Sequence, residues 1–402
     1  MLKTNKRILF ITQWEYQDGL IQSTLSYLNI IEKITGYYCY LVTTSKISNK
    51  IKVAKRGGMI MIEVPVKRRW LFLSWFYNII LLKGISDKKK VDVVHGWCTP
   101  ACSVALMLKL MKRKLKFIAD SYEPHSESMV ETGAWKTKNF KFYVLFFLER
   151  VQTRNADCFI FSAPGMEEYI LKKYGTKVSN FLVKPTCANL ERFSYNAVKN
   201  PALLDKFGLK DKITCVYAGK LGGLYLYDEI FEFIKKCEDY WGSAKFRFLL
   251  LSGSTDDEVN EVRKRFGIAS TTIIKQFVPH TEIQAYMGLA DFGFSPVKPV
   301  PSRKYCSPIK DAEYWALGLP TVITHDISID SGLIRDNNIG AVIDTLDETG
   351  YMGAIKKVDE ILKRYSRKEM YDKIRPFAEK YRNMTIAEKV YSEVYRKGGY
   401  GN

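Results

Sequence analysis

The sequence predicts an α/β fold made of two doubly wound domains. The chain has 402 residues, which is long for one ordinary domain and suggests two domains of roughly 150–200 residues. Hydrophobic residues make up 47% of it, enough for sizeable cores. Short β-rich apolar runs alternate with segments suited to helices, and an irregular segment at about 186–200 divides them into two series. This alternation indicates βαβ units and parallel sheets covered on both faces.

The predicted strands follow from these apolar runs. In the first series they are residues 7–12, 37–44, 59–66, 91–97, 116–120, 158–162 and 180–185. In the second series they are residues 213–219, 246–253, 271–277, 291–296, 320–324 and 340–344. Helices are expected at 349–365, 367–382 and 384–397. In such sheets ligands bind beyond the carboxyl ends of the strands, so polar residues just after strands are the candidates for chemistry.

The composition narrows the possible partners. Lys and Arg number 62 against 43 Asp and Glu, a formal net charge of +19. This excess suggests nucleic acid, an anionic membrane face or phosphorylated substrates, and solubility alone is the simpler explanation. None of the eight cysteines forms a C-x-x-C pair, and most lie in apolar runs, so we expect reduced core thiols in a cytosolic protein. The apolar run near the N-terminus is too short for a signal peptide.

One apolar stretch suggests contact with a membrane. Residues 70–82 are about half as long as the roughly 20 residues that span a bilayer. A helix lying on the membrane surface would place Lys67, Arg68 and Arg69 against lipid headgroups and Trp70 and Trp75 at the interface. The alternative is a core helix that covers a sheet.

The segment "YAGKLGGLYLYDEI" (217–230) is a candidate diphosphate site. A predicted strand ends at Gly219, and Lys220 and the Gly222-Gly223 pair precede a predicted helix. Glycines allow close approach of the backbone, and the helix N-terminus and the lysine favour an anion. An ordinary tight turn would show the same pattern. Neither a P-loop nor G-x-G-x-x-G occurs, which argues against an ATPase or a dinucleotide site.

The segment "SPIKDAEYWALGLPTVIT" (307–324) predicts a helix followed by a strand. Ser307 is expected as the N-cap, and Pro308 as the first helical residue. Glu313 falls at the edge of an apolar arc, where an unpaired carboxylate would be costly. The vicinal hydroxyls of a ribose would be suitable donors to it, and an ion pair with a lysine is the alternative. Lys310 lies one turn in, beside a helix N-terminus that favours anions.

Two further loops carry candidate residues. "FIADSYEPHSE" (117–127) crowds Asp120, Glu123 and His125 after a predicted strand, where they could act as base, electrostatic stabiliser or hydroxyl ligand. Solvated loop polarity is the alternative. Gly19 and Gln22 begin a predicted helix after the first strand and are weaker candidates for contact with a substrate. A metal site has little support, because the chain has no helical pair of histidines.

The motifs resemble family 4 glycosyltransferases, which have the GT-B fold of two Rossmann-like domains facing across a cleft. "SPIKDAEYWALGLPTVIT" is similar to their S-P-x-K-x-x-E-x-x-A-x-G-x-P-V signature. "VYAGKL" resembles their diphosphate motif, "KPTCANLERF" their interdomain segment and "RNADCFIFSAPGMEEYI" their A-D-x-I-x-x-S segment. "FIADSYEPHSE" resembles a loop in members that build bacterial capsular, exopolysaccharide or O-antigen glycans. The resemblance covers nearly the whole chain.

This resemblance implies a domain plan. Residues 1–185 would form the acceptor-binding domain, 186–383 the nucleotide-sugar-binding domain, and 384–402 a helix returning to the first domain. Gly19 and Gln22 would then contact the acceptor.

The resemblance also implies roles for residues. Glu313 would bind the ribose of the donor, and Ser307 and Lys310 would lie near its diphosphate and sugar. Gly219, Lys220 and Gly222 would hold the diphosphate, and Asp120, Glu123 and His125 would line the reacting centre. The chain departs from the family at two positions: Tyr305 stands where a Glu is usual, and Tyr225 stands where a second Lys is usual.

The sequence therefore predicts a glycosyltransferase using a nucleotide diphosphate sugar and a glycan acceptor, lipid-linked in our hypothesis. The resemblance implies retention of configuration. No cofactor or metal is expected, since no D-x-D triplet occurs. The protein would sit on the inner face of the membrane from the cytoplasmic side. The rivals are a sugar-nucleotide epimerase of similar fold and a nucleic-acid-binding protein, the latter disfavoured because no nucleic-acid module is recognised.

Overall fold

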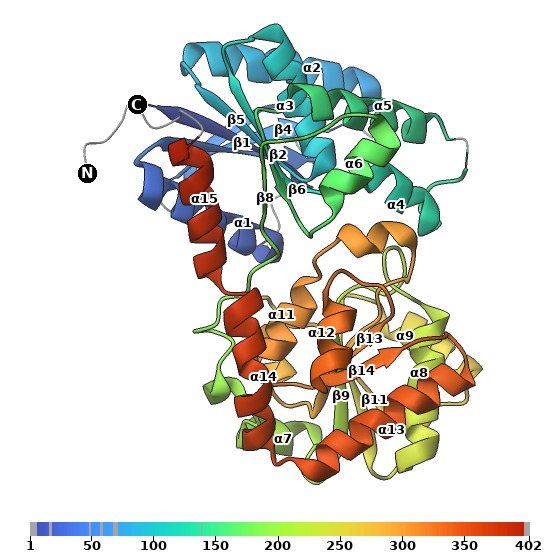
Figure 1. The fold of residues 1–402 in the computed structure, drawn as a ribbon. Helices are drawn as coiled ribbons and strands as arrows, with labels where there is room; N and C mark the ends of the chain where they lie inside the picture. Colours follow the sequence, from blue (N-terminus) through green and yellow to red (C-terminus); the bar gives the residue numbers. More distant parts are fainter. Residues whose placement is uncertain are drawn as a thin grey trace. The chain divides into compact units, whose positions relative to one another are not determined.

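The chain folds into two compact units. The computed structural model describes residues 6–15, 18–47, 50–56, 59–66, 71–137 and 139–397. Unit 1 comprises Met1–Glu127, Lys136–Pro185 and Thr385–Asn402 (Figure 1). Unit 2 comprises Ser128–Trp135 and Thr186–Met384. Each unit is built on its own sheet.

The sheet of unit 1 has the strand order β3-β4-β2-β1-β5-β6-β7-β8 over the described residues. Its strands are β1 (Arg7–Glu15), β2 (Tyr38–Ser45), β3 (Lys52–Arg56), β4 (Met59–Pro65), β5 (Val93–Trp97), β6 (Lys116–Tyr122), β7 (Cys158–Phe161) and β8 (Phe181–Val183). All neighbours are parallel except β3 and β4, which are antiparallel. The order reverses direction between β1 and β5, as in a doubly wound sheet.

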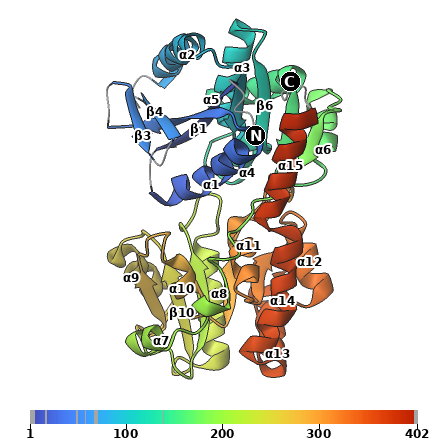
Figure 2. The ribbon, with the colours of Figure 1, turned by 90° about the vertical axis from the view of Figure 1, so that its left-hand side faces the viewer.

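Helices cover both faces of this sheet. On one face α2 (Leu71–Lys88) packs beside α3 (Thr99–Met111), and α3 packs beside α5 (Phe140–Asn155) (Figures 1 and 2). On the other face lie α1 (Asp18–Thr35) and α15 (Met384–Lys397), whose Tyr27 and Tyr391 rings meet edge-on with centroids 6.1 Å apart. Unit 1 also contains α6 (Met166–Tyr174), whereas α4 (His125–Glu131) begins in unit 1 and belongs to unit 2 from Ser128 onward. The last helix of the chain is thus part of unit 1.

The sheet of unit 2 is entirely parallel, with the order β11-β10-β9-β12-β13-β14. Its strands are β9 (Ile213–Ala218), β10 (Phe246–Leu251), β11 (Ile273–Gln276), β12 (Phe292–Ser295), β13 (Thr321–Thr324) and β14 (Gly340–Ile343). Each lies within two residues of its predicted bounds, which confirms the strand prediction for this half of the chain. Ligand sites are expected where the order reverses, between β9 and β12.

Alternate residues along these strands face two separate cores. Val216 on β9 and Leu249 on β10 point into the core that contains the helix α11 (Ile309–Ala316). Their neighbours Cys215 and Phe248 point into the opposite core. The helices around this sheet are α7 (Pro201–Phe207), α8 (Asp228–Trp241), α9 (Asp256–Arg265), α10 (Ile283–Met287), α12 (Asp330–Asn337), α13 (Glu348–Arg364) and α14 (Arg367–Tyr381). Coverage of both faces explains why the strands read as continuous apolar runs.

The predicted C-terminal helices are confirmed as α13, α14 and α15. A capping box sets the start of α14, because Ser366 accepts from the Glu369 amide while the Glu369 carboxylate accepts from the Ser366 amide. All eight cysteines are free thiols, as expected. No helix within the described residues is long and apolar enough to cross a membrane.

The sequence reading missed β3. Its residues, KVAKR, contain two lysines and an arginine and are mostly exposed on an edge strand. Charged residues are common on edge strands, because they discourage pairing with other chains. The strand therefore lacks the apolar run by which the others were recognised.

Candidate functional site

Helix α11 positions the residues of the predicted donor site in unit 2. Its Tyr314 hydroxyl hydrogen-bonds the Phe294 carbonyl at 3.1 Å and the Val216 carbonyl lies 3.3 Å away. The Tyr314 ring lies against Gly293, where a Cβ atom would come within 2.6 Å of it. The helix is thereby fixed over β9 and β12, the two strands between which the strand order reverses.

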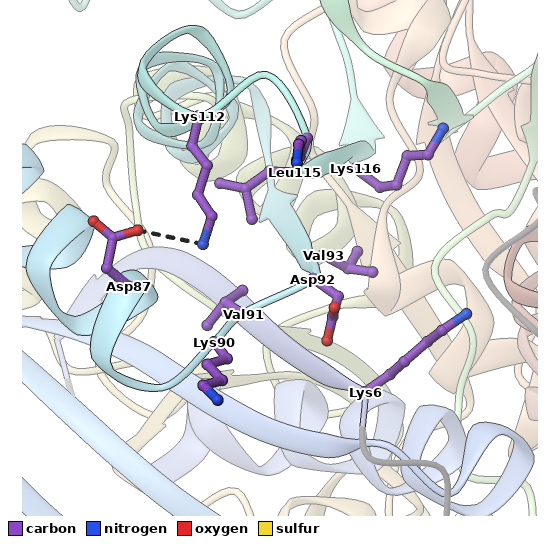
Figure 3. Close-up of a pocket in the computed structure, with 10 residues that line it drawn as sticks. Lys6, Asp87, Lys90, Val91, Asp92, Val93, Lys112, Leu115 and Lys116 are labelled. Atoms are coloured by element: carbon purple, nitrogen blue, oxygen red, sulfur yellow. Dashed lines mark ion pairs between the residues drawn. The ribbon is translucent and has the colours of Figure 1, made fainter.

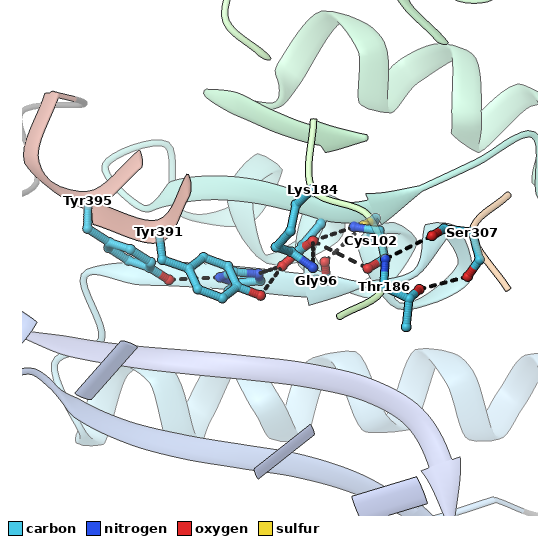
Figure 4. Close-up of polar contacts among 10 residues, drawn as sticks. Gly96, Cys102, Lys184, Thr186, Ser307, Tyr391 and Tyr395 are labelled. Carbon is cyan, nitrogen blue, oxygen red and sulfur yellow. Dashed lines mark hydrogen bonds and ion pairs between the residues drawn. The ribbon is translucent and has the colours of Figure 1, made fainter. Parts of the chain in front are cut away.

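The start of α11 differs from the prediction. The helix begins at Ile309, and Pro308 occupies the N-cap position with no side-chain capping bond, so the N-cap assignment of Ser307 was wrong. The Ser307 hydroxyl oxygen instead accepts from the Thr186 amide at 2.9 Å and from the Arg382 guanidinium. The Ser307 carbonyl also accepts from the Thr186 hydroxyl at 2.8 Å (Figure 4). These contacts tie Ser307 to the start of unit 2, and its predicted contact with a donor remains untested.

Lys310, on α11, is nearly buried between two aromatic rings. Its relative exposure is 6%, and its Nζ lies 3.9 Å from the centroid of the Tyr225 ring and 5.5 Å from that of Tyr217. No carboxylate of the described residues forms an ion pair with it. Two aromatic faces therefore hold the ammonium by cation–π attraction, and its N–H donors are available to an anionic ligand.

Gly219 is required beside Lys310. A Cβ atom at this position would lie 2.7 Å from Lys310 Cε and 3.0 Å from Nζ. The predicted donor-binding residues Gly219 and Lys310 are therefore in direct contact, although they lie far apart in the sequence. Lys220, the next residue, is exposed, and its carbonyl accepts a hydrogen bond from the Tyr217 hydroxyl.

The sequence predicts that the glycine turn leads directly into a helix, but in the structure it does not. Gly222 and Gly223 have φ of +72° and +66°, but α8 begins only at Asp228. The Leu226 amide donates to the Pro296 carbonyl, and the Tyr227 amide to the Glu229 carboxylate at 3.2 Å. Because a carboxylate already lies at the start of α8, the helix N-terminus is a poor anion site. We therefore withdraw the predicted contribution of this helix N-terminus to anion binding. The glycine turn and the lysines stay candidates.

Glu313 is nearly buried, at 7% relative exposure, and its neighbour is a histidine. Its Oε1 lies 3.8 Å from His280 Nε2, and no described lysine pairs with it, so the alternative of a Glu–Lys ion pair is wrong. His280 Nδ1 lies 3.3 Å from Arg192, whose Nε donates to Gln284 at 2.9 Å. Burial lowers the pKa of Arg192, and the Glu313 charge opposes that shift.

The sequence reading did not anticipate His280 and Arg192. His280 follows β11 by four residues, so the rule that ligand-binding residues follow strands could have pointed to it. Arg192 lies in an irregular segment 88 residues away, and no local pattern marks it. The Glu313 carboxylate therefore has partly cationic surroundings but no close hydrogen bond from them.

In unit 1, Asp120 is fully buried near the end of β6. Its carboxylate accepts from the Tyr391 hydroxyl at 2.7 Å and contacts His95 Nε2 at 3.0 Å and Lys184 Nζ at 3.4 Å. Burial alone would raise the pKa of Asp120, but Lys184, His95 and Tyr391 together hold it below its ordinary value. Asp120 is thus an ionised carboxylate enclosed by protein groups, a position that suits a structural role better than contact with substrate.

His95 has a defined tautomer in this network. Burial lowers its pKa, so the ring is neutral at physiological pH. Since Asp120 can only accept, His95 Nε2 donates to it, and Nδ1 accepts from the Tyr395 hydroxyl at 2.7 Å. The two tyrosines of α15 thereby attach that helix to β5 and β6.

Glu123 and His125 lie together after β6. His125 Nδ1 is 3.8 Å from Glu123 Oε1, and each side chain is about one-fifth exposed. The Glu123 carbonyl accepts from Thr99 at 2.7 Å, which ties the loop to the start of α3. The pair is accessible, unlike Asp120. Gly19 and Gln22 fall within α1, but their side chains lie outside the described residues.

No group of three or more His, Cys, Asp or Glu suited to a metal ion occurs in the part of the chain that the structure describes. The candidate donor site is instead built from lysines, glycines and one glutamate.

Comparisons with known proteins bear on both the fold and the site. Residues 266–394 match the family model described as "Glucosyltransferase 3-like, C-terminal domain", a range that includes α11. No curated protein sequence matches the chain significantly. The fold is GT-B. It is shared with sucrose-phosphate synthase from Thermosynechococcus elongatus, with a TM-score of 0.77, 14% identity, and coverage of 98% of this chain and 99% of that one.

Two other solved structures share this fold over their full lengths. WaaG, a glycosyltransferase involved in lipopolysaccharide biosynthesis, aligns with a TM-score of 0.72 and 14% identity over 96% of this chain and 99% of its own. Anabaena HepE, solved with UDP and glucose, aligns with a TM-score of 0.71 and 10% identity over 98% and 100%. The family-model match and the shared fold support a transferase of the class that moves sugars.

Proposed function

We propose that this protein is a glycosyltransferase that moves a sugar from a nucleotide diphosphate sugar to a glycan acceptor. The observation that carries the proposal is Lys310, an almost buried lysine with no carboxylate partner among the described residues, packed against Gly219 beside the glycine turn. A buried cation without a fixed counter-ion is costly unless an anion joins it. The diphosphate of a sugar nucleotide supplies two such charges.

The proposed chemistry places negative charge on the departing diphosphate. Lys310 and Lys220 would stabilise this charge in the transition state, and Gly219 and Gly222 would allow the phosphates to approach the backbone. Glu313 would accept hydrogen bonds from the ribose hydroxyls, and His280 lies 3.8 Å from the carboxylate on one side. This scheme uses no metal.

In unit 1, Glu123 and His125 are the proposed residues at the reacting centre. They form an accessible carboxylate–imidazole pair, which is able to orient or deprotonate a hydroxyl. Asp120 would act as a positioning residue through the His95 network. Retention of anomeric configuration and a place in the synthesis of bacterial surface polysaccharide are proposals that rest on the family resemblance.

An exposed apolar face on α2 supports a lipid-linked acceptor at a membrane. Leu73, Phe76, Tyr77 and Ile80 are each more than half exposed and recur at intervals of three and four residues. This spacing places them on one side of the helix. The predicted anchors Lys67, Arg68, Arg69 and Trp70 lie outside the described residues.

Helix α5, on the same face of the sheet, carries a second such stripe. Phe140, Tyr143 and Phe147 are exposed at one side of α5, and Arg150 and Arg154 continue that side toward its C-terminus. Apolar stripes beside basic residues, on a chain of net charge +19, match the chemistry of an anionic lipid surface. We therefore propose peripheral attachment to the inner membrane face, where a lipid-linked glycan would be reached.

Calorimetric titration of UDP, GDP and ADP tests the donor site. The protein should bind one of these nucleotides, and Glu313→Ala should raise its Kd at least about tenfold, because ribose hydrogen bonds to a charged group contribute about 1.5–3 kcal/mol. Glu261→Ala, at an exposed position on α9, is the matched control. Unchanged affinity in Glu313→Ala would remove Glu313 from the donor site.

A product assay separates transfer from the rival activities. Incubation with the nucleotide sugar and no acceptor should release nucleotide diphosphate slowly, and a glycan acceptor should accelerate the release. Formation of an epimeric nucleotide sugar would favour the epimerase instead. Salt-dependent DNA binding without any nucleotide binding would support the nucleic-acid alternative.

Sedimentation with phosphatidylglycerol vesicles tests the membrane face. Phe76→Ser/Ile80→Ser on α2 should reduce the bound fraction, because it removes apolar area from the interface. Val53→Ser/Leu171→Ser removes equally exposed apolar side chains elsewhere in unit 1 and should leave binding unchanged. Equal binding by all three proteins would contradict the assignment of α2.

A further inference from the structure

A hollow lined by lysines opens in unit 1, away from the residues discussed so far (Figure 3). Its volume is about 390 Å³. Three segments contribute lysines to it: the residue before β1, the turn after α2 and the connection after α3. These lysines are Lys6, Lys90, Lys112, Lys114 and Lys116.

The pocket lies at the amino-terminal edge of the sheet. Lys6 precedes the first residue of β1, and Lys116 is the first residue of β6. Asp120 lies toward the other end of β6, at the edge where ligands of doubly wound sheets usually bind. The lysine pocket is therefore a different place from the proposed reacting centre.

The carboxylates of the pocket do not neutralise its lysines. Two aspartates line it against five lysines, and Lys116 also pairs with Asp157, outside the pocket, at 3.5 Å. Asp87 already accepts from Lys83 at 2.8 Å and is 3.3 Å from Lys112. Asp92 accepts from the Arg7 amide at 2.9 Å. Lys90 and Lys114 form no ion pair with any described residue, and they are exposed.

Lys90 also adopts a backbone conformation that lysine rarely takes. Its φ is +48°, in the left-handed region, directly after the end of α2. Glycine or asparagine is the usual residue where a helix ends in this conformation. A lysine here retains charge at a conformational cost, which is common at functional positions. Helix-end lysines that only complement a helix dipole need neither the strained backbone nor the concave surface.

We propose that this pocket is a second anion-binding site, for a ligand that carries at least two phosphate charges. Flexible ammonium groups from three segments can surround clustered phosphate oxygens, which lysine binds as a point charge. The source could be a soluble oligophosphate or the phosphate of a lipid headgroup. Leu110 and Met111, exposed at the end of α3 beside Lys112, would suit a headgroup near a bilayer.

Calorimetric titration with inorganic tripolyphosphate tests the site. The wild-type protein should bind it, and Lys90→Gln/Lys114→Gln should raise the Kd about tenfold, because two unpaired charges are lost. Lys52→Gln/Lys172→Gln is the matched control, since both lysines are exposed in unit 1, outside the pocket. Repeating all titrations with Lys310→Met in addition removes the contribution of the donor-site lysine.

If both double variants bound tripolyphosphate equally weakly, the attraction would be diffuse and the proposal would be overturned. An absence of tripolyphosphate binding to the wild-type protein would overturn it as well. Sedimentation with phosphatidylglycerol and phosphatidylcholine vesicles identifies the source. Loss of phosphatidylglycerol binding in Lys90→Gln/Lys114→Gln alone assigns the site to a headgroup, and retained vesicle binding assigns it to a soluble phosphate. The donor-site titrations can fail without affecting either result.

Discussion

Among the residues that the structure describes, two lysines are nearly buried, one in each unit, and they differ in whether a carboxylate pairs with them. Lys184 in unit 1 is 1% exposed, lies 4.5 Å from the Tyr27 ring centroid and 4.6 Å from that of Trp97, and pairs with Asp120 at 3.4 Å. Lys310 in unit 2 is 6% exposed and also lies over aromatic rings, but has no carboxylate partner among the described residues.

This difference separates a structural lysine from a binding lysine. The charge of Lys184 is balanced by Asp120, so removing it leaves a buried carboxylate with hydrogen bonds but without its ammonium partner. The charge of Lys310 has no such partner, so removing it leaves only aromatic rings. Aromatic enclosure alone does not distinguish the two, whereas the counter-ion does.

The largest expected effect is on stability. Lys184→Met should lower the free energy of unfolding of unit 1 by about 3–5 kcal/mol, the usual cost of an uncompensated buried charge. Lys310→Met should change stability little or raise it. Urea unfolding, followed by tryptophan fluorescence, which includes that of Trp97, measures the loss of stability in Lys184→Met. Equal unfolding midpoints for both variants would contradict the comparison.

Glu149 is a buried carboxylate that forms no ion pair with any described residue, and it extends the comparison to the pH dependence of stability. Burial raises the pKa of Glu149 to about 7, against the hydrogen bonds from Ser126 and Tyr174. Between the unfolded value near 4.5 and about 7 the folded state binds the extra proton. Stability should therefore fall as pH rises through that window, by about 3 kcal/mol.

Glu149→Gln should remove this pH dependence. Thermal unfolding from pH 5 to pH 8 measures it, with Glu261→Gln at an exposed position as the control. A slope that is the same in wild type and Glu149→Gln would show that another group titrates there.

The next effect is on ligand affinity. Lys310→Met should weaken nucleotide diphosphate binding by about 1.5–3 kcal/mol, the usual contribution of a charged hydrogen bond, while leaving the unfolding midpoint in place. Calorimetry with the nucleotide that binds wild type measures it. A variant that binds as tightly as wild type would mean that the ammonium contacts no phosphate.

The smallest effect comes from the glycine against which Lys310 packs. Gly219→Ala should displace the Lys310 side chain, because the new Cβ would lie 2.7 Å from its Cε, and reduce nucleotide affinity by about 1 kcal/mol. Gly223→Ala is the control, since it also has a positive φ but no atom within 4 Å of the added Cβ. Similar losses in both would attribute the effect to backbone strain alone.

The sequence predicts the fold well because its signals are local. Apolar runs locate the strands of unit 2 to within two residues, and the three helices expected at the C-terminal end are found as α13, α14 and α15. β3 is missed because an edge strand can be charged. The N-cap assignment of Ser307 fails because its hydroxyl hydrogen-bonds residues far away in the sequence. Those partners are invisible to any local pattern.

The candidate site is predicted in part for the same reason. Gly219 and Lys310 each follow from a motif, and the structure brings them into contact. The burial of Asp120 does not follow from its motif, because its hydrogen-bond donor Tyr391 is 271 residues away. His280 and Arg192 are missed because their relation to Glu313 exists only in three dimensions.

The attachment of α15 to unit 1 has a consequence for the order in which the protein can form. Tyr391 and Tyr395 donate hydrogen bonds to Asp120 and His95, yet a ribosome makes them only after residues 186–384 of unit 2. Nearly all of unit 2 is synthesised before them. The Asp120–His95 network of unit 1 therefore cannot be completed until α15 has left the ribosome.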